Sequence, residues 1–103
     1  MVSRGEVWWY DHPEHHRRPW LILSRSAAIP VLNQVLAVPA TQTIRGIPTE
    51  VELGESDGMP AACVLSLDNM TLIRPALCTE RITTLDSRLM RRVCEALLVA
   101  TEC

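Results

Sequence analysis

The chain has 103 residues and a mass of 11.5 kDa, which is the size of one compact domain. Apolar residues make up 48% of it and charged residues 21%, a composition that excludes disordered, collagen-like and coiled-coil proteins. Twelve acidic side chains oppose ten basic ones, all of them Arg, for a formal net charge of −2. A mildly acidic chain is a poor candidate for coating nucleic acid non-specifically, because that binding rests on summed positive charge.

The chain carries no signal for membrane insertion or export. No segment reaches the roughly 18 consecutive apolar residues of a membrane span, and the N-terminus lacks the apolar core of a secretory signal. We therefore expect a cytoplasmic protein without a membrane partner. The cysteines form no C-x-x-C pair, so we expect buried or free thiols and no zinc or redox motif. They are Cys63, Cys78, Cys94 and Cys103.

Short apolar or alternating segments, separated by turn residues, predict a series of strands. The alternating pattern after Gly5 predicts an opening strand over residues 7–11. The sharpest turn signal is the segment 54–58, which ends in Asp57-Gly58. Further strands are predicted, in chain order, over residues 19–24, 34–40, 49–53, 62–67, 71–74 and 80–84.

A helical pattern follows at the end of the chain. Leu89, Val93, Leu97 and Ala100 recur at three- and four-residue spacing, and Asp86 stands where it can cap the first turn. Many short strands followed by one helix predict a mainly β fold, in which the helix covers the open side of a small, strongly curved antiparallel sheet or barrel. We expect one domain over residues 1–103.

Three segments, in this order and spacing, resemble the MazF/PemK family of endoribonuclease toxins from type II toxin–antitoxin systems. Residues 4–11 (RGEVWWYD) are similar to the family's Gly-x-hydrophobic-x-Trp-x-Asp opening, and residues 17–24 (RRPWLILS) to its Arg-Pro strand that ends in Leu-Ser. The third segment is residues 38–43 (VPATQT) with residues 45–51 (RGIPTEV). Weaker similarity continues to the last helix, so the resemblance covers nearly the whole chain.

This resemblance implies a small SH3-like barrel of the CcdB/PemK type with a C-terminal α-helix, a homodimer, and neutralisation by a MazE-like antitoxin. It also implies ribosome-independent, sequence-specific cleavage of single-stranded RNA, whether messenger, ribosomal or transfer RNA. The 2′-hydroxyl attacks the neighbouring phosphate and leaves a 2′,3′-cyclic phosphate and a 5′-hydroxyl, with no cofactor or metal. The family's two best-established catalytic positions fall on Arg18 and Thr41, and an acidic position of its relatives falls on Asp68.

The residue types at the first two positions suit that reaction. Arg is always charged and binds phosphate oxygens through its forked donors, and Pro19 biases Arg18 towards an extended conformation that fixes where its side chain leaves the backbone. The Thr41 hydroxyl can hold a phosphate oxygen or the 2′-hydroxyl, but nothing nearby in sequence can make it a general base. The groups that move the protons stay open.

Other residues are candidates for proton transfer or for substrate contact. His15, His16 and Asp68 could provide acid–base catalysis, with a solvated side chain as the alternative for each histidine. Further contacts to the substrate could come from Arg17, Gln42 and Thr43.

Three aromatic residues are candidate surfaces on which unpaired bases could stack. They are Trp8, Tyr10 and Trp20. Packing in the core is the alternative for Trp20, and it is the expectation for Trp9.

The loop between the first two strands departs from the family pattern, because it is shorter than in many relatives, lacks glycine and reads His12-Pro13-Glu14-His15-His16. Histidines at this spacing would suit a metal site on a helix. Pro13 opposes a helix, and no Cys or carboxylate completes a ligand set, so no metal is predicted. A second departure is Gln42, where many relatives carry Thr or Ser. Both lie beside the expected RNA path and bear on substrate choice.

Two other functions are weighed against this one. A non-enzymatic toxin that binds DNA gyrase, as in the CcdB family, relies on a C-terminal Trp-Gly-Ile ending, whereas residues 100–103 read ATEC. An SH3-like peptide-binding module needs an aromatic groove, and the chain has three Trp, one Tyr and no Phe.

Charge is unevenly distributed along the chain, so the net charge does not describe the charge around each segment. Residues 12–25 carry three Arg against one Glu, for a local charge of +2, although the whole chain is acidic. This local excess surrounds Arg18. It predicts a site that engages a few phosphates, with a shallower dependence on salt than in a coating protein.

Overall fold

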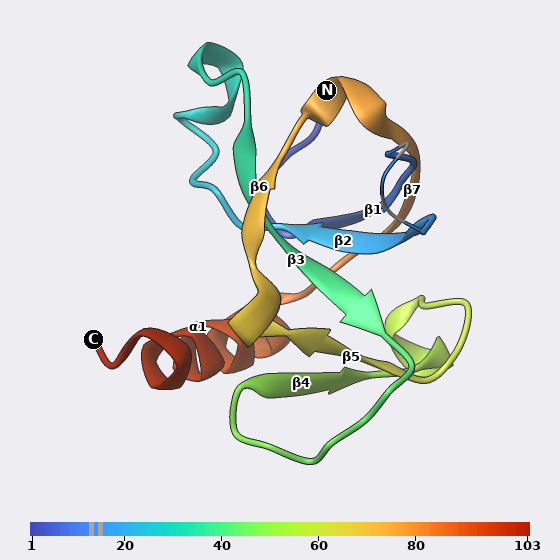
Figure 1. The fold of residues 1–103 in the computed structure, drawn as a ribbon, viewed down its shortest axis with the longest axis vertical. Coiled ribbons are helices and arrows are strands. Elements are labelled where there is room, and N and C mark those ends of the chain that lie inside the picture. Colours follow the sequence, from blue (N-terminus) through green and yellow to red (C-terminus); the bar gives the residue numbers. More distant parts are fainter. Residues whose placement is uncertain (13, 15) are drawn as a thin grey trace.

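The computed structural model describes residues 1–12, 14 and 16–103, which form a strongly curved antiparallel sheet with one long helix against it (Figure 1). The expected mainly β fold with a C-terminal helix is confirmed. The helix is α1 (Ser87–Thr101). The strands are β1 (Glu6–Tyr10), β2 (Arg18–Ile22), β3 (Val35–Thr41), β4 (Glu50–Leu53), β5 (Cys63–Ser66), β6 (Thr71–Ile73) and β7 (Cys78–Thr84).

The long strand β3 joins the two halves of the sheet. The strands pair in the order β4-β5-β3-β2-β1-β7, and β6 pairs with β3 beside this path. The first residues of β3 pair with β6, whereas its last two, Ala40 and Thr41, pair with β5. Pro39, which has no N–H to donate, lies where β3 changes from one partner to the other. Figure 1 shows β3 running diagonally between β6 and the β4–β5 pair.

The sheet is covered on both of its faces. One cluster of buried side chains lies between the sheet and α1 and includes Val7, Leu21 and Val93. A second cluster on the other face includes Ile22 and Val35. Leu21 and Ile22 are neighbours on β2 and are both fully buried, because successive side chains of a strand point to opposite faces.

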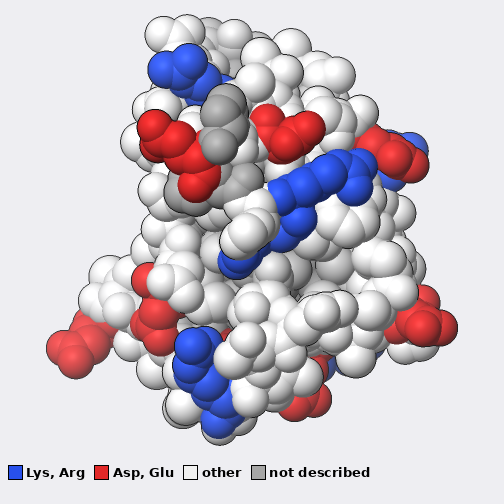
Figure 2. All heavy atoms as spheres, turned by 45° about the vertical axis from the view of Figure 1, so that its right-hand side comes forward, with Lys and Arg blue, Asp and Glu red and all other residues white. Residues whose placement is uncertain are grey.

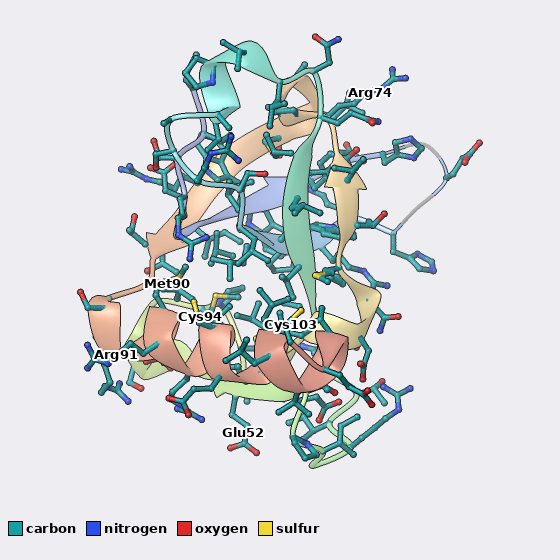
Figure 3. All side chains as sticks on the ribbon, turned by 90° about the vertical axis from the view of Figure 1, so that its left-hand side faces the viewer. Glu52, Arg74, Met90, Arg91, Cys94 and Cys103 are labelled. Carbon is teal, nitrogen blue, oxygen red and sulfur yellow. The ribbon has the colours of Figure 1, made fainter. Side chains whose placement is uncertain are left out.

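The helix begins where the sequence predicts. Asp86 caps it, since its Oδ1 accepts a hydrogen bond from the backbone N–H of Leu89 at 2.9 Å. Figure 3 shows Met90 and Cys94 on the side of α1 that faces the sheet and Arg91 on the side turned away. The buried helix residues are Leu89, Val93 and Ala96. Among the described residues, no helix combines the length and apolarity that a membrane crossing requires.

The four cysteines are free thiols, as expected. Cys63 is buried and Cys103 is exposed. Burial raises the pKa of the Cys78 thiol to about 11 and also raises the pKa of Cys63. Both thiols therefore stay protonated and weakly nucleophilic near neutral pH.

Glu6, at the start of β1, links three parts of the fold. Burial alone would raise the pKa of its carboxyl. Hydrogen bonds from the Trp8 indole N–H (3.0 Å) and the Ser3 backbone N–H (2.8 Å), together with Arg81 at 3.2 Å, outweigh burial and hold the pKa below its ordinary value of 4.5. A carboxyl with a depressed pKa stabilises the folded state above its unfolded-state pKa, and this stabilisation is lost as the pH falls through the folded value.

We therefore expect Glu6→Gln to lower the free energy of unfolding at neutral pH, and this deficit to shrink as the pH falls from about 5 to about 3. Urea denaturation of wild type and variant across this range measures the difference. Glu52→Gln, at an exposed position on β4, is the matched control. A difference between wild type and Glu6→Gln that is the same at every pH would contradict the assignment.

Candidate active site

Arg18 and Thr41 lie at the same end of two paired strands. Arg18 is the first residue of β2, and Thr41 is the last residue of β3. The strands are antiparallel with Trp20 opposite Pro39, so Arg18 and Thr41, each two residues beyond this pair, both lie at the end of the sheet where a cleft opens. The sheet thus brings together the two residues that are predicted to be catalytic.

Both residues line a cleft of about 400 Å³ at this end of the sheet. One wall comes from β1 and the segment before β2, another from the end of β3 and the loop after it, and a third from the connection between β4 and β5. Figure 2, which turns this side of the molecule forward, shows a band of arginine atoms across the middle of the face. The polar and aromatic lining residues are Trp9, His16, Arg17, Arg18, Thr41, Gln42 and Thr43.

The two central side chains offer donors to an anion. Arg18 is half-buried, and among the described residues the only ion pair joins Arg81 to Glu6, so the Arg18 charge is not neutralised by a carboxylate there. The Thr41 Oγ1 accepts a hydrogen bond from the backbone N–H of Thr43 at 3.2 Å. Because one lone pair of the oxygen is engaged in this way, the hydroxyl proton is free to be donated to a ligand.

Trp9 is a site residue that the sequence-based expectation missed. The guanidinium carbon of Arg17 lies 4.3 Å from the centroid of the Trp9 ring, within the range of a cation–π interaction. Trp9 is only half-buried and belongs to neither core cluster. The prediction that it packs in the core is wrong because Trp9, two residues after the buried Val7, lies past the end of the core, where the cleft opens.

The predicted stacking surfaces lie elsewhere. Tyr10 and Trp20 are 3% and 5% exposed and pack edge-to-face with their ring centroids 5.8 Å apart, so neither ring is available to a base. This corrects the stacking role expected for both and agrees with the alternative of core packing for Trp20. Both rings belong to the second core cluster, on one face of the β1–β2 pair. Trp8 is half-buried, donates its indole N–H to Glu6 and does not line the cleft.

The proton-transfer candidates are only partly brought together. His16 is exposed and lines the cleft beside Arg17. His15 and Pro13 lie outside the described residues. Thr41 pairs with Val64 near the start of β5, whereas Asp68 follows the end of that strand.

Asp68 has a structural partner instead. Its Oδ2 accepts a hydrogen bond from the Thr49 hydroxyl at 2.6 Å, and the backbone N–H of Leu67 donates to the carbonyl of Thr49 at 3.0 Å. These bonds join the start of β4 to the turn that follows β5. The structure therefore places Asp68 away from the Arg18–Thr41 cleft.

The third wall of the cleft is formed by a largely apolar segment. Met59 and Cys63 are buried, and Pro60 and Ala61 lie between them. The Thr83 hydroxyl donates to the backbone carbonyl of Asp57 at 3.0 Å and fixes the preceding turn against β7. The Asp57-Gly58 turn is predictable from sequence, but no local signal indicates that the residues after it face Arg18.

A carboxylate holds the loop that carries Gln42 and Thr43. The Glu50 Oε1 accepts hydrogen bonds from the backbone N–H groups of Arg45 at 3.0 Å and Gly46 at 2.9 Å. The Glu50 N–H itself donates to the carbonyl of Ile47 at 3.0 Å. The middle of the loop is thereby joined to the start of β4.

We expect Glu50→Ala to lower the free energy of unfolding by about 1–3 kcal/mol, because two backbone donors lose their acceptor. Hydrogen exchange of the Arg45 and Gly46 amides should accelerate in the same variant. Glu50→Gln keeps an acceptor oxygen and should preserve most of the protection at both amides. Equal protection in Glu50→Ala and wild type would show that the carboxylate does not hold the loop.

The arrangement suits binding of a phosphodiester with an attached base. A permanent cation and a hydroxyl donor lie side by side in the cleft, and a stacked cation–aromatic pair flanks them. Among residues 1–12, 14 and 16–103, no three His, Cys, Asp or Glu side chains gather closely enough to hold a metal ion.

Comparisons with known proteins show to which family the chain belongs. The model of a family described as "PemK-like, MazF-like toxin of type II toxin-antitoxin system" matches residues 3–100. The chain is similar to probable endoribonuclease MazF5 of Mycobacterium tuberculosis H37Rv, with 43% identity over 100% of this chain and 95% of that protein. It is 32% identical to probable endoribonuclease MazF2 of M. tuberculosis CDC 1551, over 99% of this chain and 100% of that protein.

Solved structures show the same fold. An endoribonuclease in complex with its cognate antitoxin, from a mycobacterial species, superposes with a TM-score of 0.89 at 28% identity, over 99% of this chain and 96% of that one. The M. tuberculosis toxin MazF-mt6 has a TM-score of 0.85 at 29% identity, over 94% of this chain and 96% of that one. The resemblance seen in the sequence is confirmed: the chain belongs to the PemK-like, MazF-like toxin family of type II toxin–antitoxin systems.

Proposed function

We propose that this chain is the toxin of a type II toxin–antitoxin system and acts as a ribosome-independent endoribonuclease on single-stranded RNA in the cytoplasm. The observation that carries the proposal is that Arg18 of β2 and Thr41 of β3 line one cleft whose cations have no carboxylate partner among the described residues. Relatives that are 43% and 32% identical carry the name of probable endoribonucleases.

In the proposed reaction the RNA supplies its own nucleophile. The 2′-oxygen attacks the adjacent phosphorus, a P–O2′ bond forms, and the P–O5′ bond breaks. One proton leaves the 2′-hydroxyl and one is added to the departing 5′-oxygen, so the products are a 2′,3′-cyclic phosphate and a 5′-hydroxyl. Arg18 binds the non-bridging oxygens, on which negative charge increases, and the Thr41 hydroxyl donates to the same phosphate.

His16 is the described histidine that lines the cleft, and we assign it to one of the two proton transfers. Imidazole titrates near neutral pH and can either accept or donate a proton. The pH–rate profile of His16→Ala should lose one of its limbs, with His15→Ala as the comparison. A profile that is unchanged in both variants would remove the histidines from proton transfer.

The proposed partners are a second copy of the chain and a MazE-like antitoxin. The solved mycobacterial relative that is bound to its cognate antitoxin supports the second assignment. Neither a gyrase-binding nor a peptide-binding function has comparable support. None of the residues that line the cleft comes from the C-terminal segment, and the rings of Tyr10 and Trp20 are buried and cannot form an aromatic groove.

The test is incubation of the purified protein with defined single-stranded RNAs in EDTA, followed by analysis of the new ends. We expect cleavage that leaves 5′-hydroxyl ends. Thr41→Val, which removes the hydroxyl at nearly constant size, should slow cleavage, and Thr41→Ser should retain most of it. A protein that cuts no RNA pool but inhibits DNA gyrase would overturn the proposal.

A further inference from the structure

The stacked pair of Trp9 and Arg17 is the feature of the cleft that phosphate chemistry does not explain. Trp9 is held within the sheet on both sides, opposite Pro19 of β2 and Glu80 of β7. Arg17 lies over this ring at 4.3 Å. A long, flexible side chain is therefore fixed against a rigid support before any ligand arrives.

Arg17 and Arg18 have different neighbours in the cleft. Arg18 is the first residue of β2 and pairs with Tyr10 of β1. Arg17 instead lies over Trp9, which pairs with Pro19, two residues after Arg17. The Arg17 guanidinium thus has an aromatic partner of its own, although both arginines line the same cleft.

The Arg17 guanidinium lies over the Trp9 ring and leaves the rest of its surface open to solvent. Arginine planes and aromatic rings are the surfaces on which unpaired bases stack in single-stranded RNA recognition. Arg17 is exposed, and no carboxylate of a described residue pairs with it. The site therefore offers a flat, cationic platform within reach of the position where Arg18 holds the phosphate.

We propose that Trp9 and Arg17 form a stacking subsite for one nucleobase next to the scissile phosphate of single-stranded RNA. This inference rests on the proposed ribonuclease function and adds a base-binding role that phosphate contact alone does not provide. Stacking uses the face of the base and not its edge, so the subsite accepts all four bases. It positions the substrate, whereas sequence selection comes from other contacts.

The experiment compares RNAs that carry one abasic nucleotide at successive positions around the cleavage site. The scissile nucleotide carries a 2′-deoxy group for binding measurements, so that affinity is read without cleavage. For the wild-type protein, an abasic nucleotide at one flanking position should weaken binding by about 5- to 100-fold, the size of one lost base stack. At this position Arg17→Lys should bind intact and abasic RNA almost equally, because lysine keeps the charge but loses the plane.

The dependence of binding on salt separates stacking from a pure phosphate contact. Arg17→Lys should leave the salt slope unchanged, whereas Arg17→Gln should reduce it by about 1. Arg88→Lys, at an exposed position of α1, is the matched control. Trp9→Phe, which keeps a smaller ring under Arg17, should lose only part of the effect of the abasic nucleotide.

Two results would overturn the inference. One is an abasic scan that is flat in the wild-type protein, and the other is an abasic effect of equal size in Arg17→Lys and wild type. Both leave the proposed function intact if the wild-type protein still cleaves all-ribose RNA. Failure to cleave any RNA would instead remove the proposed function, and thermal unfolding midpoints of all variants exclude loss of folding as a cause.

Discussion

Arg18→Ala should lower the single-turnover rate of RNA cleavage by about 100- to 1,000-fold, the usual effect of removing one donor that faces developing negative charge. Arg18 is half-buried in the cleft that Thr41 also lines, and no carboxylate of a described residue competes for it. The cleavage rate of Arg18→Lys should lie between those of Arg18→Ala and wild type, because an ammonium group supplies the charge without the forked donors. Cleavage of one defined RNA under enzyme excess measures the rate.

Arg88→Ala is the matched control for loss of positive charge, since Arg88 lies on α1, outside the cleft. Its cleavage rate should stay within a factor of two or so of wild type. Thermal unfolding should show both variants to be folded. An Arg18→Ala protein that is folded and cleaves within tenfold of the wild-type rate would exclude Arg18 from the chemistry.

Gly58→Ala should lower the free energy of unfolding by about 2–5 kcal/mol. Gly58 has a φ of +93°, which disfavours any residue with a Cβ. A Cβ at this position would also lie 2.4 Å from the Thr83 Oγ1 and 2.8 Å from the Thr83 Cβ. Because Met59 and Pro60 follow directly and form a wall of the cleft, the same substitution should displace that wall.

Gly46→Ala separates the two causes. Gly46 also has a positive φ, of +69°, but nothing lies within 4 Å of a Cβ built there. Its substitution should cost only the backbone strain, about 1 kcal/mol. Urea denaturation with an unchanged m-value measures the free energy of unfolding of both variants. Equal losses of this free energy in the two variants would show that the contact with Thr83 does not destabilise Gly58→Ala.

The features that could be predicted from the sequence are those that depend on neighbouring residues. The capped helix after Asp86 was predictable because its period and its cap are local patterns, and the turn at Asp57-Gly58 because it needs a positive φ that glycine provides. The family, too, could be recognised from short segments in a fixed order. The local charge around Arg18 indicated the side of the molecule on which the cleft lies, whereas the net charge did not.

The burial of the aromatic residues could not be predicted in the same way. An alternating strand pattern separates two faces, but it identifies the exposed face only when one side of the sheet is solvated. Here β1 and β2 lie between two cores, so Tyr10 and Trp20 are buried. Trp9 is the residue that reaches the cleft, because its place along the strand lies past the end of the core.

By itself, the sequence determined the residue types, the local elements and the family. Tertiary structure alone decided which of these residues meet. Arg18 of β2 and Thr41 of β3 line one cleft, and the turn fixed by Thr83 adds the wall that begins at Met59. Asp68 is hydrogen-bonded to Thr49 and does not line this cleft. Such proximities depend on strand pairing between segments far apart in the chain, and no local pattern records that pairing.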